Sequence, residues 1–247
     1  MGVVNTGEAL YLEDASLWMN NNENIPQERY FTYSFSPIYI EGSKIGGVLN
    51  TVTETTERIL NNRQLKLLRY FSTSSHLTRY FRELGSHTTE ATRMNDASRI
   101  IANVLTPYFQ DVPFASIYFT DTLSQLVLAS TVHIDQGSDC CPTIVSASVE
   151  YSSIKQKNLI TALLRVAQSD NAEYFDLEGY EVPKVHPGIP ENSHVRGCML
   201  MPIEMTHGTT AGVMLVAVSP NRAFDETYRG FFKLLAGQTA TLIGNAK

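Results

Sequence analysis

The stretch Ser219-Pro220-Asn221-Arg222-Ala223-Phe224-Asp225-Glu226-Thr227-Tyr228, near the end of the chain, decides the fold class. An apolar run over residues 211–218 precedes it and has the composition of a buried strand. Pro220 has no N–H to donate to a sheet, so the strand is expected to end at Ser219. From residue 225 to 245 the apolar side chains recur at helical spacing. The stretch therefore predicts a strand, a short loop and a long amphipathic closing helix.

The residues before this stretch predict an α+β domain. Apolar runs separated by turn residues indicate hairpins, and apolar residues three and four apart indicate helices. The expected strands are residues 113–120, 125–133, 172–177, 196–205 and 211–218. The expected helices are residues 96–108, 152–167 and 225–245, with loops over 134–150 and 179–195. Hairpin-linked strands predict an antiparallel sheet with helices packed on one face.

The N-terminal third predicts a β-hairpin followed by a helix. Residues 30–40 and 45–52 have the composition of two strands, and Glu41-Gly42-Ser43 supplies the turn. Pro37 is expected at a sheet edge or a bulge. A helix is expected over residues 54–84, with Thr53 as its N-cap and with Glu54 and Glu57 at the positive end of its dipole.

One face of that helix predicts self-association. Leu60, Leu67 and Phe71 repeat at intervals of seven and four, which is the spacing of a seam between two helices. The other face carries charged side chains: Arg58, Arg63, Lys66 and Arg69. We therefore expect a homodimer formed through these connector helices.

Composition limits the class of protein. Of 247 residues, 43% are hydrophobic and 18% are charged, which is enough to build a core. The net charge of −6 argues against a nucleic-acid partner. No apolar run approaches eighteen residues, so no membrane span is expected. Three cysteines, two of them adjacent, do not form a disulfide framework, and a cytoplasmic location is expected.

Two parts of the chain resemble known families. Residues 87–247 resemble a complete GAF domain, through Asp111-Val112-Pro113-Phe114-Ala115 and the stretch from Ser219-Pro220 to Gln238. Residues 1–53 resemble the C-terminal half of a PAS domain, through Tyr30-Phe31-Thr32-Tyr33-Ser34-Phe35-Ser36-Pro37-Ile38 and Gly46-Gly47-Val48. Residues 54–86 would be the connector helix between them.

The PAS resemblance is incomplete at two points. Trp18 resembles a residue of the linker into the Tyr30–Ile38 strand, so the earlier strands of that family are expected to be absent. Most PAS domains end with Asp, an aliphatic residue and Thr, whereas this chain has Thr51-Val52-Thr53. The turn into the connector helix is therefore expected to lack its Asp.

The resemblance implies a sensory or regulatory module of intracellular signal transduction. The chain resembles the input region of a two-component (phosphorelay) histidine kinase. Such a region passes a conformational signal through connector helices to an output domain. The Asn- and Gly-rich boxes of a kinase ATP site do not occur in these residues, so no enzymatic activity and no cofactor are expected, and any small-molecule ligand is unknown. Two alternatives stay open: a thiol enzyme similar to GAF-fold free methionine sulfoxide reductases, and a small-molecule-binding module without kinase output.

Each residue that could be catalytic or bind a ligand is more simply interpreted as a structural residue. His76 is preceded by a stretch similar to the approach to a phospho-accepting histidine, but no acid follows it. Cys140 and Cys141 adjoin Asp139, which would raise a thiol pKa, and Cys198 lies in an apolar strand. The remaining candidates lack the spacing of metal ligands or of a phosphate loop: His186, His194, His207 and Gly46-Gly47. No catalytic or metal-binding residue is therefore expected.

Overall fold

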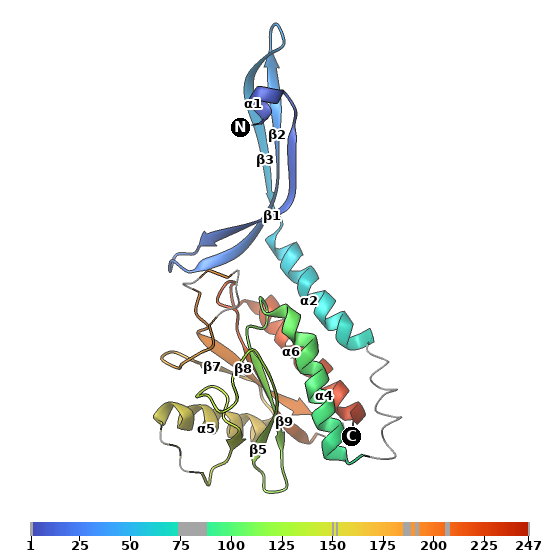
Figure 1. Ribbon diagram of the computed structural model, residues 1–247, viewed down its shortest axis with the longest axis vertical. Helices are drawn as coiled ribbons and strands as arrows, with labels where there is room; N and C mark the ends of the chain where they lie inside the picture. The colour runs from blue at the N-terminus through green and yellow to red at the C-terminus, as the bar shows by residue number, and fades with distance from the viewer. Residues whose placement is uncertain are drawn as a thin grey trace. The chain divides into compact units, whose positions relative to one another are not determined.

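The fold is given by a computed structural model (Figure 1), which describes residues 2–73, 88–149, 151, 153–184, 189–190, 193–205 and 208–246. The chain forms two compact units, Met1–Arg63 and Gln64–Lys247, and each has its own sheet. Their boundary falls inside helix α2 (Thr56–Thr73), within the segment expected to be the connector.

The first unit is a three-stranded antiparallel sheet in the order β1-β2-β3. Its strands are β1 (Leu10–Asn20), β2 (Pro26–Ile40) and β3 (Lys44–Glu54), and a short helix α1 (Val3–Thr6) precedes them. The predicted hairpin is confirmed as β2 and β3. The position of Pro37 is also confirmed: the pairing of β1 with β2 stops at Phe35, and a bulge follows at Ile38.

Strand β1 corrects the sequence interpretation, which expected a linker around Trp18 and no earlier strand. Trp18 lies in β1 and pairs with Glu28 of β2. Glu13 and Asp14 lie at a bulge between the two apolar parts of this strand, and Asp14 has a φ of 51°. A strand broken by two carboxylates loses the period-two pattern that identifies strands in a sequence.

Asp14 bonds the start of α2 to the sheet. Its carboxylate accepts hydrogen bonds from Thr55 Oγ1 at 2.7 Å and from Arg58 at 2.6 and 2.7 Å. The turn from β3 into α2 was expected to lack an aspartate, but Asp14 of β1 supplies one. The helix begins at Thr56 rather than Glu54, because Thr53 and Glu54 still pair with β2 as the last residues of β3.

The second unit contains a six-stranded antiparallel sheet in the order β6-β5-β4-β9-β8-β7. The strands are β4 (Ala115–Thr120), β5 (Leu126–Val132), β6 (Ile144–Val145), β7 (Glu173–Asp176), β8 (Gly197–Glu204) and β9 (Thr210–Ala217). The helices are α4 (Glu90–Leu105), η1 (Thr106–Tyr108), α5 (Ile154–Ser169) and α6 (Glu226–Ala246). The predicted α+β class with an antiparallel sheet is confirmed.

Two features of this unit differ from the prediction by more than a residue or two at an end. Helix α4 begins at Glu90 rather than at residue 96, because Thr89 is its N-cap and accepts a hydrogen bond from the Thr92 N–H. Strand β6 lies inside the predicted loop 134–150 and pairs with Leu126 and Val127 of β5. A two-residue strand is too short to give a periodic signal.

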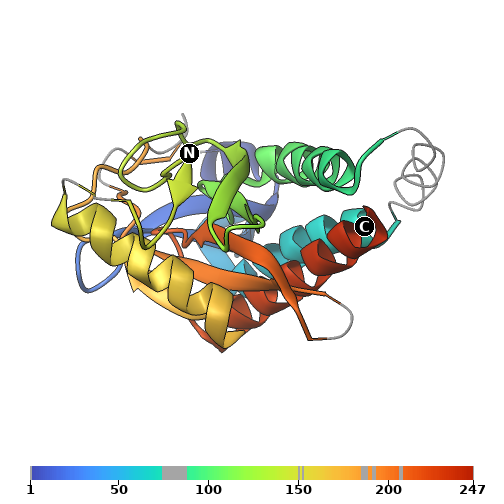
Figure 2. The ribbon, with the colours of Figure 1, turned by 90° about the horizontal axis from the view of Figure 1, so that it is seen from below.

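Helices pack on both faces of this sheet, which corrects the expectation of a single covered face. Met214 and Val216 of β9 join the core that includes α4 and α6. Val213 and Leu215 join a second core built with α5 and the residues around Cys141. The strands thus lie between α5 and the α4–α6 pair (Figure 2). A strand that is apolar at consecutive positions predicts burial on both sides, and residues 213–217 of β9 form such a run.

The C-terminal half of α2 belongs to the core of the second unit. Leu67 is fully buried and Phe71 is 2% exposed, both in the core that includes α4 and α6. Leu60 is also buried, at 6% exposure. The predicted dimer seam is therefore wrong in its residues, since these side chains are already covered within one chain. Residues 74–86 of the expected connector lie outside the described residues.

Strand β7 pairs with only the first half of β8. It pairs with residues from Gly197 to Leu200. Met201, Pro202, Ile203 and Glu204 pair with β9 on the other side, and no strand among the described residues pairs with them on the β7 side. This half of β8 is an open sheet edge with a proline in it.

Candidate functional site

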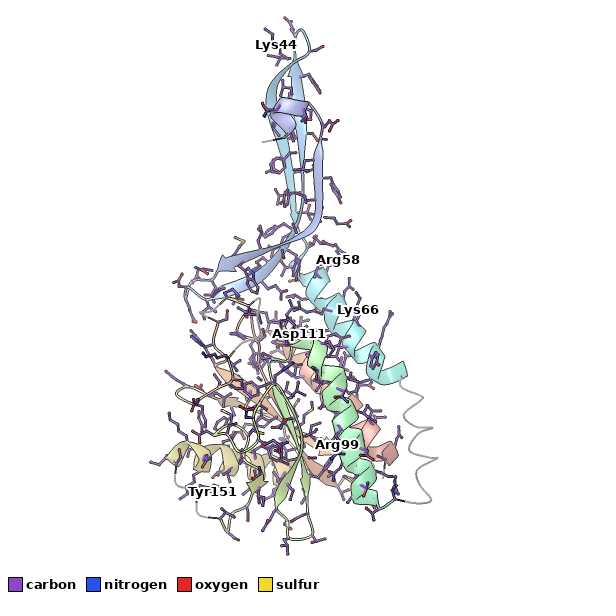
Figure 3. All side chains as sticks on the ribbon, in the orientation of Figure 1. Lys44, Arg58, Lys66, Arg99, Asp111 and Tyr151 are labelled. Atoms are coloured by element: carbon purple, nitrogen blue, oxygen red, sulfur yellow. The ribbon has the colours of Figure 1, made fainter. Side chains whose placement is uncertain are left out.

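A buried polar junction connects the Ser219–Arg222 loop with two helices of the second unit. Asp111, labelled in Figure 3, is fully buried in the turn before β4. Its carboxylate is 3.4 Å from the guanidinium of Arg222, which is 7% exposed. Gln64 of α2 donates to the same carboxylate oxygen, also at 3.4 Å. Charges this deep are compatible with folding only when they are paired.

Tyr228 of α6 closes the junction with a hydrogen-bonded bridge. The Ser219 N–H donates to the Tyr228 hydroxyl at 3.0 Å, and that hydroxyl donates to the Asp111 carbonyl at 2.5 Å. The Arg222 guanidinium lies over the Tyr228 ring, 4.1 Å from its centre. Asn221 donates to Ser193 Oγ at 2.6 Å. Hydrogen bonds therefore join the loop after β9 to α2, to α6 and to the turn before β4.

The junction contains an unsatisfied buried donor. Arg222 Nε is buried and has no hydrogen-bond partner within the described part of the chain. A buried donor without an acceptor costs about 1–3 kcal/mol. The arrangement of the junction is therefore less stable than a fully satisfied one would be.

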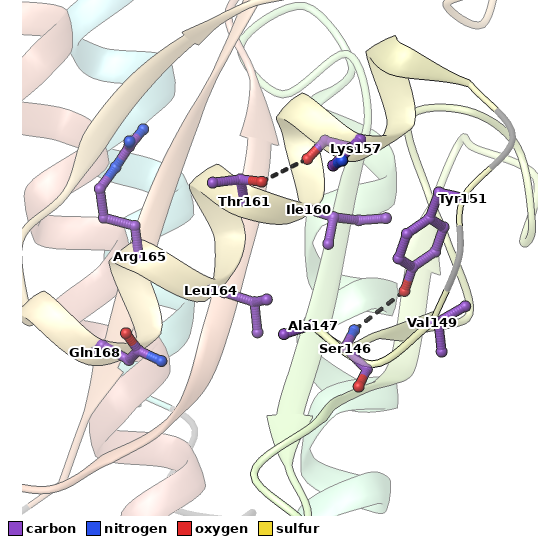
Figure 4. Close-up of a pocket in the computed structure, with 10 residues that line it drawn as sticks. All are labelled: Ser146, Ala147, Val149, Tyr151, Lys157, Ile160, Thr161, Leu164, Arg165 and Gln168. Atoms are coloured by element: carbon purple, nitrogen blue, oxygen red, sulfur yellow. Dashed lines mark hydrogen bonds between the residues drawn. The ribbon is translucent and has the colours of Figure 1, made fainter.

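A groove of about 740 Å³ lies between α5 and the residues after β6 (Figure 4). Its apolar lining comes from Ala147, Val149, Ile160 and Leu164. Tyr151 holds one wall, because its hydroxyl accepts from the Ser146 N–H and donates to the Ile144 carbonyl, both at 3.1 Å. An apolar floor with a few polar groups is the general character of a small-molecule site.

Two cations line this groove, and they differ in their partners. Arg165 forms a two-point ion pair with Glu173, at 2.9 Å and 2.5 Å. Lys157 has no ion-pair partner in the described residues, and its carbonyl accepts from the Thr161 hydroxyl at 2.7 Å. The groove thus offers one uncommitted positive charge beside an apolar floor.

The three cysteines lie in the core on the α5 side of the sheet. All are fully buried. Burial raises the pKa of the Cys140 thiol to about 12, and the neighbouring Asp139 acts in the same direction. Burial also raises the pKa of Cys198 well above its usual range, and that of Cys141, whose sulfur lies 3.7 Å from the Tyr118 hydroxyl. At neutral pH these thiols are protonated, which is the unreactive form.

The other candidates from the sequence do not come together. His194 is exposed, whereas His76, His186 and His207 lie outside the described residues. Gly46 and Gly47 are residues of β3, as expected. In the described part of the chain, no group of three or more His, Cys, Asp or Glu is arranged to hold a metal ion. None of the described helices is long and apolar enough to cross a bilayer.

Sequence reasoning missed Asp111 and Tyr228 as members of a site. In the sequence, Asp111 indicates only the approach to a strand, and Tyr228 indicates only a position in a helix. The available signal is an aspartate a few residues before one apolar strand and an arginine a few residues after another. Their proximity depends on β4 pairing with β9, which a single sequence does not show.

Comparisons with known proteins identify no family for this chain. No family profile matches it, and no curated protein does. Among solved structures, it is similar to the GAF domain of an Acinetobacter phosphoenolpyruvate-protein phosphotransferase, with 18% identity, 75% of this chain and 95% of that chain covered, and a TM-score of 0.44. It is also similar to the GAF domain of the Coxiella burnetii phosphotransferase, with 15% identity, 74% and 94% covered, and a TM-score of 0.43.

A third similar structure is an enzyme, the type II free methionine-R-sulfoxide reductase of Thermoplasma acidophilum. Its identity is 11%, the match covers 63% of this chain and 95% of that chain, and the TM-score is 0.42. At such identities and TM-scores, none of the three assigns an activity to this chain.

Proposed function

We propose that this chain is a sensory or regulatory module of signal transduction that passes a conformational change through α2 and α6. The buried polar junction supports this proposal, because one carboxylate, Asp111, is bonded from α2 and from the loop that leads into α6. A buried network with an unsatisfied donor is suited to two alternative arrangements. The output domain, a histidine kinase core or another type, is part of the proposal, as are a homodimeric state and a cytoplasmic location.

Hydrogen exchange tests the junction as a relay. Asp111→Asn removes the charge that pairs with Arg222, so amides of α2 after Gln64 and of the first turns of α6 should both exchange faster. Asp121→Asn is the matched control, because the Asp121 carboxylate also accepts two hydrogen bonds, from Leu123 and Gln125, but within an exposed hairpin turn. Its effect should stay in that turn. Unchanged exchange in α2 of the Asp111 variant would contradict the relay.

A small-molecule ligand is a second element of the proposal, supported by the groove beside α5. Lys157 and the apolar floor favour a ligand with an apolar body and one negative group. Native mass spectrometry of the purified chain would detect a bound compound. Thr161→Trp should then abolish binding by filling the groove. Thr241→Trp should not, although Thr241 is likewise an exposed helical threonine bonded to a carbonyl four residues earlier.

We also propose that the chain is not a thiol enzyme. The three buried, protonated thiols support this. The wild-type chain should show no reduction of free methionine sulfoxide in the presence of a dithiol reductant. Turnover that disappears in Cys140→Ser or Cys198→Ser would establish the alternative instead.

A further inference from the structure

A second groove of the second unit lies between α6 and the half of β8 that β7 leaves unpaired, and we call it the α6 groove. Its volume is about 970 Å³. Three methionines of β8, each at most 9% exposed, form its floor: Met199, Met201 and Met205. The middle of its helical wall consists of small residues: Ala236, Gly237 and Ala240. A Cβ added at Gly237 would have no atom within 4 Å, so the space beside the helix is open.

The helix and the strand run in the same direction along this groove. At one end, the ring of Tyr174, which pairs with Met199, lies 5.3 Å from the ring of Phe224, just before α6. At the other end, a Cβ added at Gly244 would lie 4.0 Å from Met205 Cε. The first half of α6 therefore lies beside the start of β8, and the last turn of α6 lies beside its end.

The charged side chains that line the groove are separated by sign. Arg229 and Lys233 belong to the first half of α6. Glu204 is the last residue of β8 and pairs with Thr210 of β9. Asp170 accepts a hydrogen bond from the Thr210 hydroxyl, so it lies at the same end as Glu204. The groove thus has a cationic end and an anionic end.

One charge at each end is uncommitted. In the part of the chain that the structure describes, neither Lys233 nor Glu204 forms an ion pair. Arg229, by contrast, lies 4.0 Å from Glu226 and over the Phe224 ring. From Lys233 to the last turn of α6 the helix rises by about 16 Å. That exceeds the Debye length of about 8 Å at physiological salt, so the two free charges act independently.

We propose that the α6 groove binds a short, mainly apolar peptide with free termini, whose ammonium group lies at Glu204 and whose carboxylate lies at Lys233. Five extended residues span about 16 Å, which matches the separation of the two ends. Thioether side chains adapt to apolar groups of different shapes, and the volume is in the range of small-ligand sites. A fatty acid would leave Glu204 without a partner, so the charge pattern favours a ligand charged at both ends.

The termini and side chains of the peptide carry its recognition, rather than an added β-strand. The Arg196 carbonyl faces β7 and the Gly197 carbonyl faces β9, so the alternation along β8 directs the backbone of Pro202 to the open edge. Because proline has no N–H, a ladder along this edge is interrupted there. This site is separate from the groove beside α5, and its ligand contacts α6, the helix through which we propose the signal passes.

Isothermal titration calorimetry of the full chain with the pentapeptide Ala-Leu-Ala-Leu-Ala tests the two ends. Acetylation of its N-terminus and amidation of its C-terminus each remove one charge, and each should weaken binding about twofold to fivefold. In Glu204→Gln, acetylation should lose most of its effect and amidation should keep its effect. In Lys233→Met the reverse should hold. Lys66→Met is the matched control, because Lys66 is an exposed helical lysine outside the groove, and it should bind like the wild type.

A pair of groove-filling variants separates this site from the groove beside α5. Thr241 lines the α6 groove and Thr161 lines the other. Thr241→Trp should abolish binding of the pentapeptide, and Thr161→Trp should leave it unchanged. A compound bound beside α5 should show the opposite pattern, so either site can fail without the other.

Three results would overturn the proposal. One is a wild-type chain that binds no pentapeptide up to about 1 mM. Another is equal affinity for the free peptide and for the same peptide capped at both termini. The third is tight binding of decanoate that depends on Lys233 but not on Glu204, which would make the groove a fatty-acid site. Far-UV circular dichroism checks that each variant is folded, and the comparison of capped and free peptides needs only the wild type.

Discussion

Two tyrosines of the second unit each form a hydrogen-bonded bridge of the same kind. Because one is buried and the other is not, their hydroxyls should contribute unequally to the free energy of unfolding. Tyr228 and Tyr151 each accept from a backbone N–H and donate to a backbone carbonyl. Tyr228 is fully buried, whereas Tyr151 is half-buried at the rim of the groove. Replacing either by Phe keeps the ring and removes only the bridging hydroxyl.

The expected cost of Tyr228→Phe is about 2 kcal/mol, because a buried N–H and a buried carbonyl each lose a partner that water does not replace. The ring contacts stay, including the one with Phe232 at 4.6 Å between ring centres. For a unit of this size, that loss lowers the melting temperature by about 4–8 °C. Tyr151→Phe should cost less, about 0.5 kcal/mol, since one of its two partners, the carbonyl of Ile144, belongs to a residue that is 45% exposed and can bond to water instead.

Urea titration followed by far-UV circular dichroism measures both variants. The chain has a single tryptophan, Trp18, in the first unit, so its fluorescence reports that unit separately and should not shift in either variant. If Tyr228→Phe costs no more than Tyr151→Phe, burial does not decide the value of these hydroxyls and the polar junction is not a stabilising network.

Three further predictions concern the backbone, pH and the thiols. Gly212→Ala should prevent folding of the second unit, because the added Cβ would lie 1.9 Å from the Tyr118 carbonyl oxygen. Gly237→Ala should instead stabilise α6 by up to about 1 kcal/mol in the same urea assay, because the added Cβ would have no atom within 4 Å. The hydrogen bond from Thr55 and the charge of Arg58 lower the pKa of Asp14, so the unfolded chain binds this proton more tightly. Stability of the first unit should therefore be complete at neutral pH and fall as the pH drops below about 4, as followed by Trp18 fluorescence, and Asp14→Asn should remove that component. Ellman's reagent should label none of the three cysteines in the native protein and all of them in urea, and fast native labelling would contradict their burial.

Local patterns in this sequence were sufficient for most of the second unit. The run over residues 211–218 and the helical spacing after residue 225 survive in the structure as β9 and α6, with ends one residue away. Both elements are long and strongly apolar on at least one side, so their local signal and their tertiary environment agree.

The errors come from interactions between distant residues. The strand β1 needs β2 as a partner, and Asp14 at its bulge gains its role only beside Thr55 and Arg58, some forty residues later. The spacing of Leu67 and Phe71 indicated an apolar stripe correctly, but periodicity does not tell whether the covering surface is a second helix or the core of the same chain. For the same reason the Asp111–Arg222 pair was not predictable.

Pro202 has a consequence for how this protein behaves at high concentration. The half of β8 that β7 leaves unpaired is apolar and would otherwise be a template for strands of other molecules. A proline there has no N–H to offer an incoming strand, so it interrupts the ladder in the middle of the open edge. Because Pro202 keeps its place opposite Val213 of β9, this protection against strand addition costs the native sheet no partner.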